Sequence, residues 1–398
     1  MEWIDNKFKN TGDSERFTED FSPEDIQSAY DFHTSMSQYE STALHELPDR
    51  AQSLGLSALY VKDESTRFGL NAFKGLGASY AMARYFAGQL NEEIDDMDFN
   101  RLRSALNGRP PETFVTATEG NHGKGVAWGA KIFKQQGRVF MPKGTAGARL
   151  QAVTEIGADA EVTEMNYDDT VQYAAEQAKR NGWVLMQDTA WEGYTEIPLN
   201  IMRGYTTIIS EVQAQLGRSS LAEVSHVVLQ AGVGSFAGAM AAALYKVTDG
   251  IPPKIIIVEP EAADPIFRSA ASDSGKPVRV HGEMNTVMTG LSCGAPSVIG
   301  WDILKSTVDH FVSCDDTASD KGMRMYGRPP GEDPSIVSGA SGAVPFGFLA
   351  EVMTNDKYSE LKKHMELDES SKVLLFNTEG NTDPGNRRRV MESKEEDQ

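Results

Sequence analysis

Strands and helices alternate through the middle of the chain, and this alternation limits the possible folds more than any other feature. Over residues 82–196 the pattern predicts strands at 113–117, 138–141, 159–163 and 183–187, separated by helices at 123–134, 146–156 and 168–180. Repeated strand–helix units form parallel sheets with right-handed crossovers. We therefore expect the α/β class, with an open parallel-sheet domain at residues 82–196.

Further predicted strands indicate a second parallel sheet on either side of that domain, at 226–230, 254–259, 309–313 and 372–377. The larger domain would combine residues 1–81 with 197–398, and the smaller domain would be inserted into it. A chain of 398 residues with 40% hydrophobic content is long enough to bury two such cores. Residues 387–398 have the charge density of a disordered end.

The most informative short motif is Asn71-Ala72-Phe73-Lys74-Gly75, which puts Lys74 on a turn between a strand and a helix. Residues 58–64 are predicted to form the buried strand, and residues 77–90 have small and aromatic side chains at helical spacing. An amine held at such a place can lose its proton more easily and attack a carbonyl to form an imine. The alternative is an ordinary surface lysine near the start of a helix.

A glycine-rich loop, Gln230 to Gly238, follows an apolar strand and opens a helix. Gly232 and Gly234 let the backbone approach an anion closely, so the free N–H groups at the helix start can hold a phosphate. No lysine follows in the Walker pattern, which argues against a nucleotide triphosphate loop. Two alternatives remain: a turn selected for tight packing, or the dinucleotide turn of a nicotinamide dehydrogenase with Glu259 as its ribose-binding acid.

A second loop, Thr118-Glu119-Gly120-Asn121-His122, also leads from a strand into a helix. It supplies backbone N–H groups for a carboxylate, together with an amide, an imidazole and an acid. We predict no metal site, because the seven histidines are scattered without a His-x-x-x-His pair and the two cysteines lie far from metal-finger spacing.

Charge and composition exclude several classes of partner. The 38 basic and 58 acidic residues give a net charge of −20, which argues against nucleic acid and anionic membranes. The first residues lack a basic region followed by an apolar core, and no apolar run reaches spanning length. Cys293 and Cys314 fit a reduced cytoplasmic protein better than a disulfide scaffold.

The lysine motif, the asparagine-bearing loop and the glycine loop, in this chain order, resemble the fold type II family of pyridoxal-phosphate enzymes, the tryptophan synthase beta-like group. Within that group the resemblance narrows to the diaminopropionate ammonia-lyase family. The segments that carry it are 61–65, 67–74, 165–171, 187–194, 256–260 and 378–383. They extend from about residue 57 to 385, so the similarity covers nearly the whole chain.

The resemblance implies pyridoxal 5'-phosphate as cofactor and a small amino acid as substrate. Lys74 would hold the cofactor as an internal aldimine, and Thr378 would face its pyridine nitrogen. The other implied contacts are Gly232, Val233, Gly234 and Ser235 to the phosphate, Asn121 to the ring hydroxyl, and Thr118, Gly120, Asn121 and His122 to the substrate carboxylate. The implied reaction is α,β-elimination of ammonia from 2,3-diaminopropionate, giving pyruvate and ammonia, in a homodimer.

Two acids, Asp188 and Glu119, are candidates for removing the α-proton. In the lyases that this chain resembles, each position carries an Asp, one per face of the planar substrate–cofactor adduct, so that both enantiomers are accepted. Asp188 keeps this pattern, whereas Glu119 is longer by one methylene. The alternative for Asp188 is a helix cap or an ion pair, and for Glu119 a carboxylate that only orients His122 or Lys124.

Three further positions differ from the lyase pattern. Ala340 stands where the lyases usually carry Glu, which removes a carboxylate expected near the cofactor. Pro265 replaces a cysteine, so Cys293 has no disulfide partner, and Lys124 replaces an Arg. These differences leave open another fold type II β-eliminase or β-replacement enzyme, similar to serine/threonine dehydratase or cysteine synthase, and a non-catalytic paralogue.

Overall fold

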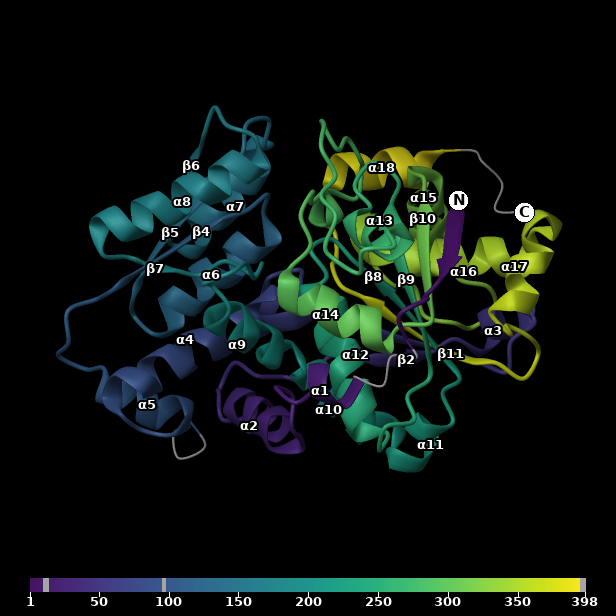
Figure 1. Ribbon diagram of the computed structural model, residues 1–398, viewed down its shortest axis with the longest axis horizontal. Coiled ribbons are helices and arrows are strands. Elements are labelled where there is room, and N and C mark those ends of the chain that lie inside the picture. The colour runs from purple at the N-terminus through teal and green to yellow at the C-terminus, as the bar shows by residue number, and fades with distance from the viewer. Residues whose placement is uncertain (10–13, 95–97, 394–398) are drawn as a thin grey trace.

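The computed structural model describes residues 1–9, 14–94 and 98–393, which form two lobes side by side (Figure 1). Each lobe is built around one sheet, with seven strands in the larger lobe and four in the smaller. The α/β fold predicted from the alternating pattern is confirmed. The domain boundaries at 82 and 196 stay a prediction; the first lies within a continuous helix, α4 (Lys74–Leu90).

The large sheet has the strand order β1-β10-β9-β8-β11-β3-β2. Its strands are β1 (Glu2–Asp5), β2 (Leu44–Glu46), β3 (Ala58–Asp63), β8 (His226–Gln230), β9 (Lys254–Pro260), β10 (His310–Cys314) and β11 (Lys372–Asn377). The five central strands are parallel, whereas the edge strands β1 and β2 pair antiparallel to their neighbours. Neither edge strand was predicted from the sequence, because three or four residues are too few to show an alternating pattern.

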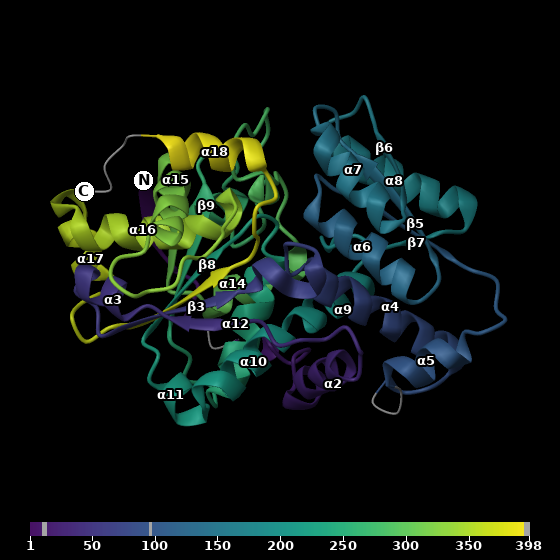
Figure 2. The same cartoon turned by 180° about the vertical axis from the view of Figure 1, so that it is seen from behind.

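Helices cover both faces of the large sheet, as Figures 1 and 2 show from opposite sides. Along β8, Val227 and Leu229 pack into one core cluster and Val228 packs into another. Successive side chains of a strand point to opposite faces of the sheet, so neighbouring residues of β8 enter different clusters. Both faces of the sheet carry apolar side chains because helices bury both of them. Strands of this kind appear in the sequence as continuous apolar runs, which is why the central strands could be predicted.

Helices and short 3-10 turns surround the large sheet. In chain order they are α1 (Ser14–Phe17), α2 (Pro23–Thr34), α3 (Pro48–Leu54), η1 (Glu64–Gly69), α9 (Glu196–Tyr205), α10 (Thr207–Leu216), α11 (Arg218–Ala222), α12 (Ser235–Val247), α13 (Pro265–Ala271), η3 (Thr289–Leu291), α14 (Val298–Thr307), α15 (Asp316–Gly327), α16 (Ala340–Thr354), η4 (Asp356–Tyr358), α17 (Ser359–His364) and α18 (Pro384–Glu392). Within the described ranges, no helix combines the length and apolar character that crossing a membrane requires.

The small sheet is parallel throughout, with the order β6-β5-β4-β7. Its strands are β4 (Thr113–Ala117), β5 (Gln136–Met141), β6 (Asp159–Val162) and β7 (Val184–Leu185), and the helices of this lobe are α5 (Phe99–Ala105), α6 (Asn121–Ile132), α7 (Gly147–Ile156) and α8 (Tyr167–Asn181). Helix α8 packs on one face of the sheet, and α6 and α7 pack on the other. The predicted strands and helices of this lobe agree with the structure to within a few residues.

One prediction about the chain end is wrong. Residues 387–392 belong to the helix α18, whose Asp383 side chain accepts a hydrogen bond from the Asn386 backbone N–H at the helix start. Arg389 in that helix pairs with Asp320 of α15 at 2.8 Å, and Val390 is buried. The charged residues that suggested disorder therefore include Arg389, which forms an ion pair, and they lie partly on a helix that packs against the large lobe. Residues 394–398 lie outside the described residues.

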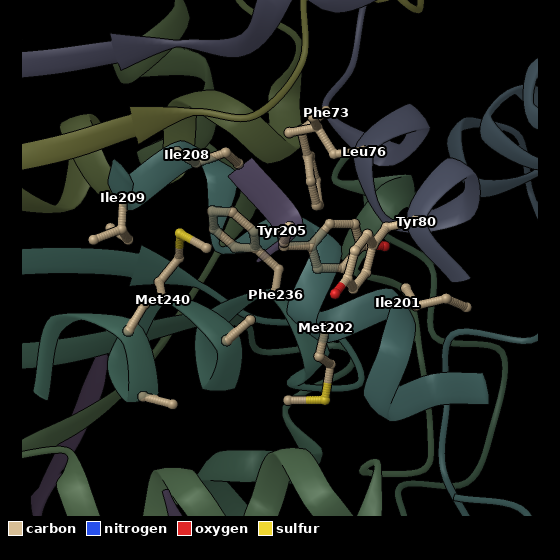
Figure 3. Packing of buried hydrophobic residues seen from close by; sticks show 14 of the residues in the cluster. Phe73, Leu76, Tyr80, Ile201, Met202, Tyr205, Ile208, Ile209, Phe236 and Met240 are labelled. Atoms are coloured by element: carbon tan, nitrogen blue, oxygen red, sulfur yellow. The ribbon is translucent and has the colours of Figure 1, made fainter. Parts of the chain in front are cut away.

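An apolar cluster joins α4 to α9, α10 and α12, and Figure 3 shows how its side chains interlock. Phe73, next to Lys74, has its ring centroid 4.7 Å from that of Tyr205 and 4.6 Å from that of Phe236. Aromatic pairs at such distances pack tightly and add stability beyond simple burial. The backbone at Lys74 is thereby anchored to the start of α12, where the glycine-rich loop ends.

Candidate active site

A pocket lies between the lobes, beyond the carboxyl ends of the parallel strands, where open α/β sheets bind ligands. All of the site residues predicted from the sequence line it: Lys74, Thr118, Glu119, Gly120, Asn121, His122, Asp188, Gly232, Val233, Gly234, Ser235 and Thr378. They come from the ends of separate elements of both lobes. The fold therefore brings together residues that are far apart along the chain.

Lys74 is the first residue of α4, and its amine donates to the Asp188 carboxylate with an Nζ–Oδ2 distance of 2.5 Å. The Phe73 and Tyr205 rings also face the amine, with centroids 5.1 and 5.6 Å from Nζ. Burial alone lowers the pKa of Lys74, but the Asp188 carboxylate outweighs it and raises that pKa above its ordinary value. The expectation that this amine loses its proton more easily is therefore wrong for the structure as described, because the sequence could not show the neighbouring carboxylate.

Asp188 lies against the Lys74 amine on one side and the His122 imidazole on the other. Burial raises the pKa of Asp188, yet His122 and Lys74 together bring it down to about 2. The His122 Nε2 lies 2.7 Å from the Met186 carbonyl oxygen, which can only accept, so this nitrogen carries the proton. Burial lowers the pKa of His122, which favours the neutral ring. Its Nδ1 then presents a lone pair 3.7 Å from Asp188 Oδ2.

The glycine loop ends at the N-terminus of α12, whose first residue is Ser235. Gly234 has φ of +89°, and a Cβ there would lie 3.1 Å from Ile266 Cδ1. A Cβ on Gly232 would lie 3.1 Å from the Leu291 backbone. The loop thus needs glycine for both conformation and space, and it points backbone N–H groups and a positive helix end into the pocket.

The same loop is tied to the proposed proton acceptor. The Ser235 hydroxyl donates to the Asp188 backbone carbonyl at 2.6 Å. This hydrogen bond fixes the start of α12 relative to residue 188, so an anion bound at that helix start would lie at a defined place relative to the Asp188 carboxylate.

Asn121 begins α6 and donates to the Glu379 carboxylate with an Nδ2–Oε2 distance of 2.6 Å. The other oxygen of Glu379 accepts from the Ser341 backbone N–H at 3.0 Å, in the first turn of α16. Ala340 itself brings no carboxylate to the pocket, and Glu379, on the loop after β11, places one at the start of α16.

Glu119 also faces the pocket, on the loop that precedes α6. Burial raises the pKa of Glu119 to about 7, although the nearby Arg149 guanidinium opposes the shift. Arg149, on α7, donates to the Glu119 backbone carbonyl at 3.3 Å and to the Thr289 hydroxyl at 2.6 Å. This arginine therefore joins the small lobe to η3 of the large lobe directly beside the candidate acid.

Thr378 lies just beyond β11, and its hydroxyl accepts from the Gln230 amide at 2.7 Å. The amide oxygen of Gln230 is buried, and no hydrogen-bond partner is found for it among the described residues. Buried polar atoms normally have partners, so an unpaired one beside a pocket indicates a place where a polar ligand binds.

Taken together, these groups fit pyridoxal phosphate. Lys74 offers the amine, the loop before α12 offers a phosphate cradle that a Cβ would fill, and Asn121 and Thr378 offer polar groups for the ring. Glu259 does not support the dinucleotide alternative. It is fully buried, and its carboxylate accepts from the Ile266 and Phe267 backbone N–H groups at 3.0 and 2.6 Å, so it caps α13.

Several residues that line the pocket were not predicted from the sequence, among them Arg149, Tyr167, Gln230, Cys293 and Glu379. Arg149 and Cys293 lie in segments without any motif, so no local signal could have found them. Glu379 directly follows Thr378 and was within reach of the motif analysis. Cys293 is a free thiol, and burial raises its pKa, so the thiol form is favoured.

Comparison with known proteins gives a consistent result. The family model described as "Pyridoxal-phosphate dependent enzyme" matches residues 36–377. The chain is 46% identical over 363 residues to a diaminopropionate ammonia-lyase of Salmonella typhimurium, covering 89% of this chain and 88% of that protein. It is 42% identical over 387 residues to the diaminopropionate ammonia-lyase of Escherichia coli strain K12, and this match covers 97% of this chain and 95% of that protein.

Solved structures of similar proteins have the same architecture. The crystal structure of the selenomethionine-incorporated holo diaminopropionate ammonia lyase from Escherichia coli superposes with a TM-score of 0.90 at 41% identity, covering 98% of this chain and 96% of that one. The crystal structure of the same protein in complex with an aminoacrylate-PLP azomethine reaction intermediate superposes with a TM-score of 0.88. Threonine deaminase isoform 2 from Solanum lycopersicum, at 20% identity and a TM-score of 0.73, shares the fold.

Proposed function

This chain belongs to the pyridoxal-phosphate dependent enzyme family and groups within it with the diaminopropionate ammonia-lyases, and we propose that it eliminates ammonia from 2,3-diaminopropionate to give pyruvate and ammonia. The observation that carries this proposal is the 46% identity over 89% of the chain to a diaminopropionate ammonia-lyase. The pocket supports it, because Lys74 and Asp188 lie in contact beside a phosphate cradle. Family membership also removes the nicotinamide dehydrogenase alternative.

The pocket residues would hold the cofactor at three points. Lys74 would bond to it, the backbone N–H groups of residues 232–235 would bind its phosphate, and Asn121 and Thr378 would contact its ring. When bound, pyridoxal phosphate supplies a carbonyl for the substrate amine and an electron sink that stabilises negative charge at the α-carbon. The protein must then position the substrate and move its protons.

Asp188 is proposed to move the α-proton of the L-substrate. Its pKa of about 2 keeps it ionised, so it is in the carboxylate form that can accept a proton, in contact with the Lys74 amine. His122 Nδ1, 3.7 Å away, offers a second acceptor behind Asp188. We propose that the proton taken up on this side is delivered to the departing β-amine.

Glu119 is proposed to move the α-proton of the D-substrate, from the opposite side of the pocket. A pKa of about 7 leaves it partly protonated near neutral pH, which weakens it as an acceptor but allows it to donate. The carboxylate of the substrate would be held by Thr118, Gly120, Asn121 and His122, on the loop where α6 begins. There the helix end and the Thr118 hydroxyl, which accepts from the Gly120 N–H at 3.0 Å, fix the loop shape.

A substrate panel tests the function. Purified holoenzyme is supplied with L- and D-diaminopropionate, L-serine, L-threonine and L-cysteine, and kcat/KM for 2-oxo acid release is compared. We expect L-diaminopropionate to give the highest value. A higher value for serine or threonine would instead make the protein a dehydratase of the same fold, and no turnover of any of them would favour a non-catalytic paralogue.

We also propose that the enzyme is a cytoplasmic homodimer. The net charge of −20 and the reduced cysteines support the compartment. The dimer rests on the resemblance, and the region 197–248 of the large lobe is the proposed contact. Fractionation of the native cell tests the proposed compartment, and light scattering tests the proposed dimer.

A further inference from the structure

A cluster of two histidines and one aspartate lies at the edge of the large sheet, outside the active site. Asp5 ends β1, His310 begins β10, and His364 ends α17. Their carboxylate and imidazole atoms all lie within 4.8 Å of one another. Long stretches of chain separate the three residues, so the spacing rules that predicted no metal site could not detect them.

The position of each residue follows from the sheet register. Asp5 lies directly opposite His310 in the antiparallel β1–β10 pair. The Met365 carbonyl, next to His364, accepts from His226 Nε2 at 2.9 Å, and His226 is the first residue of β8. Trp3 packs on the His364 ring with centroids 4.7 Å apart. The cluster is thus fixed at the amino ends of the parallel strands, whereas the active-site pocket lies beyond their carboxyl ends.

The donor atoms converge on one point. His310 Nδ1 lies 2.9 Å from Asp5 Oδ1, and His364 Nε2 lies 2.7 and 2.8 Å from the two carboxylate oxygens. Two ligand atoms on a tetrahedral zinc ion with bonds of about 2.1 Å are about 3.4 Å apart. The three hydrogen-bond distances within the cluster are shorter than that value, and all of the donor atoms lie within 4.8 Å of one another, so small side-chain movements are enough to admit an ion.

We propose that Asp5, His310 and His364 form a binding site for a divalent transition-metal ion, with zinc as the best-suited common ion. Two imidazoles and one carboxylate are a donor set typical of Zn²⁺, and imidazole donors disfavour Mg²⁺ and Ca²⁺. Asp5 and His364 are exposed, so water can complete the coordination. The ion joins β1, β10 and α17, and its role is structural. This site is independent of the reaction proposed above.

Zinc titration of the holoenzyme by calorimetry tests the site. We expect one tightly bound ion per chain, and an affinity at least about 100-fold lower in His364→Ala and in Asp5→Asn, since losing even an outer-shell partner can cost 10–100-fold. Both substitutions are at exposed positions, and unchanged turnover shows that the variants fold. His281→Ala, at another exposed histidine, is the matched control and should bind zinc as the wild type does.

Thermal unfolding supplies a second readout. Zinc should raise the Tm of the wild type and of His281→Ala but not that of His364→Ala, because an ion that binds only the folded protein stabilises it. Equal zinc affinity and stoichiometry in the wild type and in His364→Ala would overturn the proposal. Zinc that binds all variants equally and also blocks turnover would place the ion in the active-site pocket instead, and would overturn the proposal as well.

Discussion

At the scale of single residues, the proposed reaction depends on the pair formed by Lys74 and Asp188. The amine and the carboxylate are 2.5 Å apart, with side chains only 17% and 8% exposed. Breaking a buried pair leaves the other charge without compensation, so each group strongly affects the protonation of the other. The sequence identified both residues but could not show this contact, because 114 positions separate them.

The first prediction concerns Asp188→Asn. Removing the proposed acceptor should lower kcat/KM for L-diaminopropionate by about 10²–10⁴-fold, the usual contribution of a general base. Turnover of the D-enantiomer should fall much less, and Glu119→Asp should raise D-turnover while leaving L-turnover nearly unchanged. Kinetics of both enantiomers on the wild type and both variants provide the measurement. Equal losses for both enantiomers in Asp188→Asn would show that Asp188 has a shared role, exerted through Lys74.

The second prediction concerns pH. Glu119 has a pKa of about 7, raised by burial, so its carboxylate form becomes populated as the pH rises through neutrality. Asp188, with a pKa of about 2, stays ionised over the same range. The ratio of D- to L-turnover should therefore increase as the pH rises through about 7. Taking the ratio cancels the ionisation of shared groups.

Glu119→Gln provides the control for that measurement, because an amide of similar shape cannot titrate. The pH-dependent part of the ratio should disappear in this variant. A ratio that keeps its rise in Glu119→Gln would assign the titration to another group.

At the scale of elements, strand ends and helix starts position the site. The glycine-rich loop between β8 and α12 could be predicted from sequence, because glycines after an apolar strand have a direct geometric meaning. The central strands were equally clear, since each is a continuous apolar run. The edge strands β1 and β2 were not, and neither was the helix α18, whose charged sequence conceals the Arg389–Asp320 pair.

The third prediction is for Gly234→Ala. A Cβ at this position would lie 3.1 and 3.2 Å from Ile266 and Leu304, at φ of +89°. Strain of this kind costs about 1–3 kcal/mol, so we expect a lower Tm and weaker binding of pyridoxal phosphate, measured by fluorescence titration of the apoenzyme.

The control for this prediction is Gly88→Ala in α4, where no atom lies within 4 Å of the added Cβ. This change should preserve cofactor affinity and stabilise the helix by up to about 1 kcal/mol. Equal cofactor affinity in both variants would contradict the proposed phosphate cradle.

At the scale of the whole molecule, the pocket belongs to both lobes. Glu119 and Asn121 come from the small lobe, Thr378 follows β11 of the large sheet, and Lys74 begins α4, the helix in which the predicted domain boundary lies. Arg149 reaches across to Thr289, a contact that no sequence pattern indicated. The sequence thus predicted the two sheets and the motifs at their ends. It could not predict the contacts between lobes, because these depend on how the sheets are placed relative to each other.

The fourth prediction concerns assembly. We expect light scattering at micromolar concentration to give about twice the chain mass of 43.5 kDa. A monomer with full activity under the same conditions would contradict the proposed homodimer without affecting the proposed reaction.

The ratio of ammonia to pyruvate released from L-diaminopropionate tests the proposed reaction more directly than any other measurement. Elimination of the β-amine followed by hydrolysis of the α-imine yields two ammonia molecules for each pyruvate, whereas dehydration of serine yields one. We expect a ratio of two for the wild-type holoenzyme, and loss of both products in Lys74→Ala by several orders of magnitude. A ratio of two that persists in Lys74→Ala at the wild-type rate, or no release from the wild type, would contradict the proposed reaction.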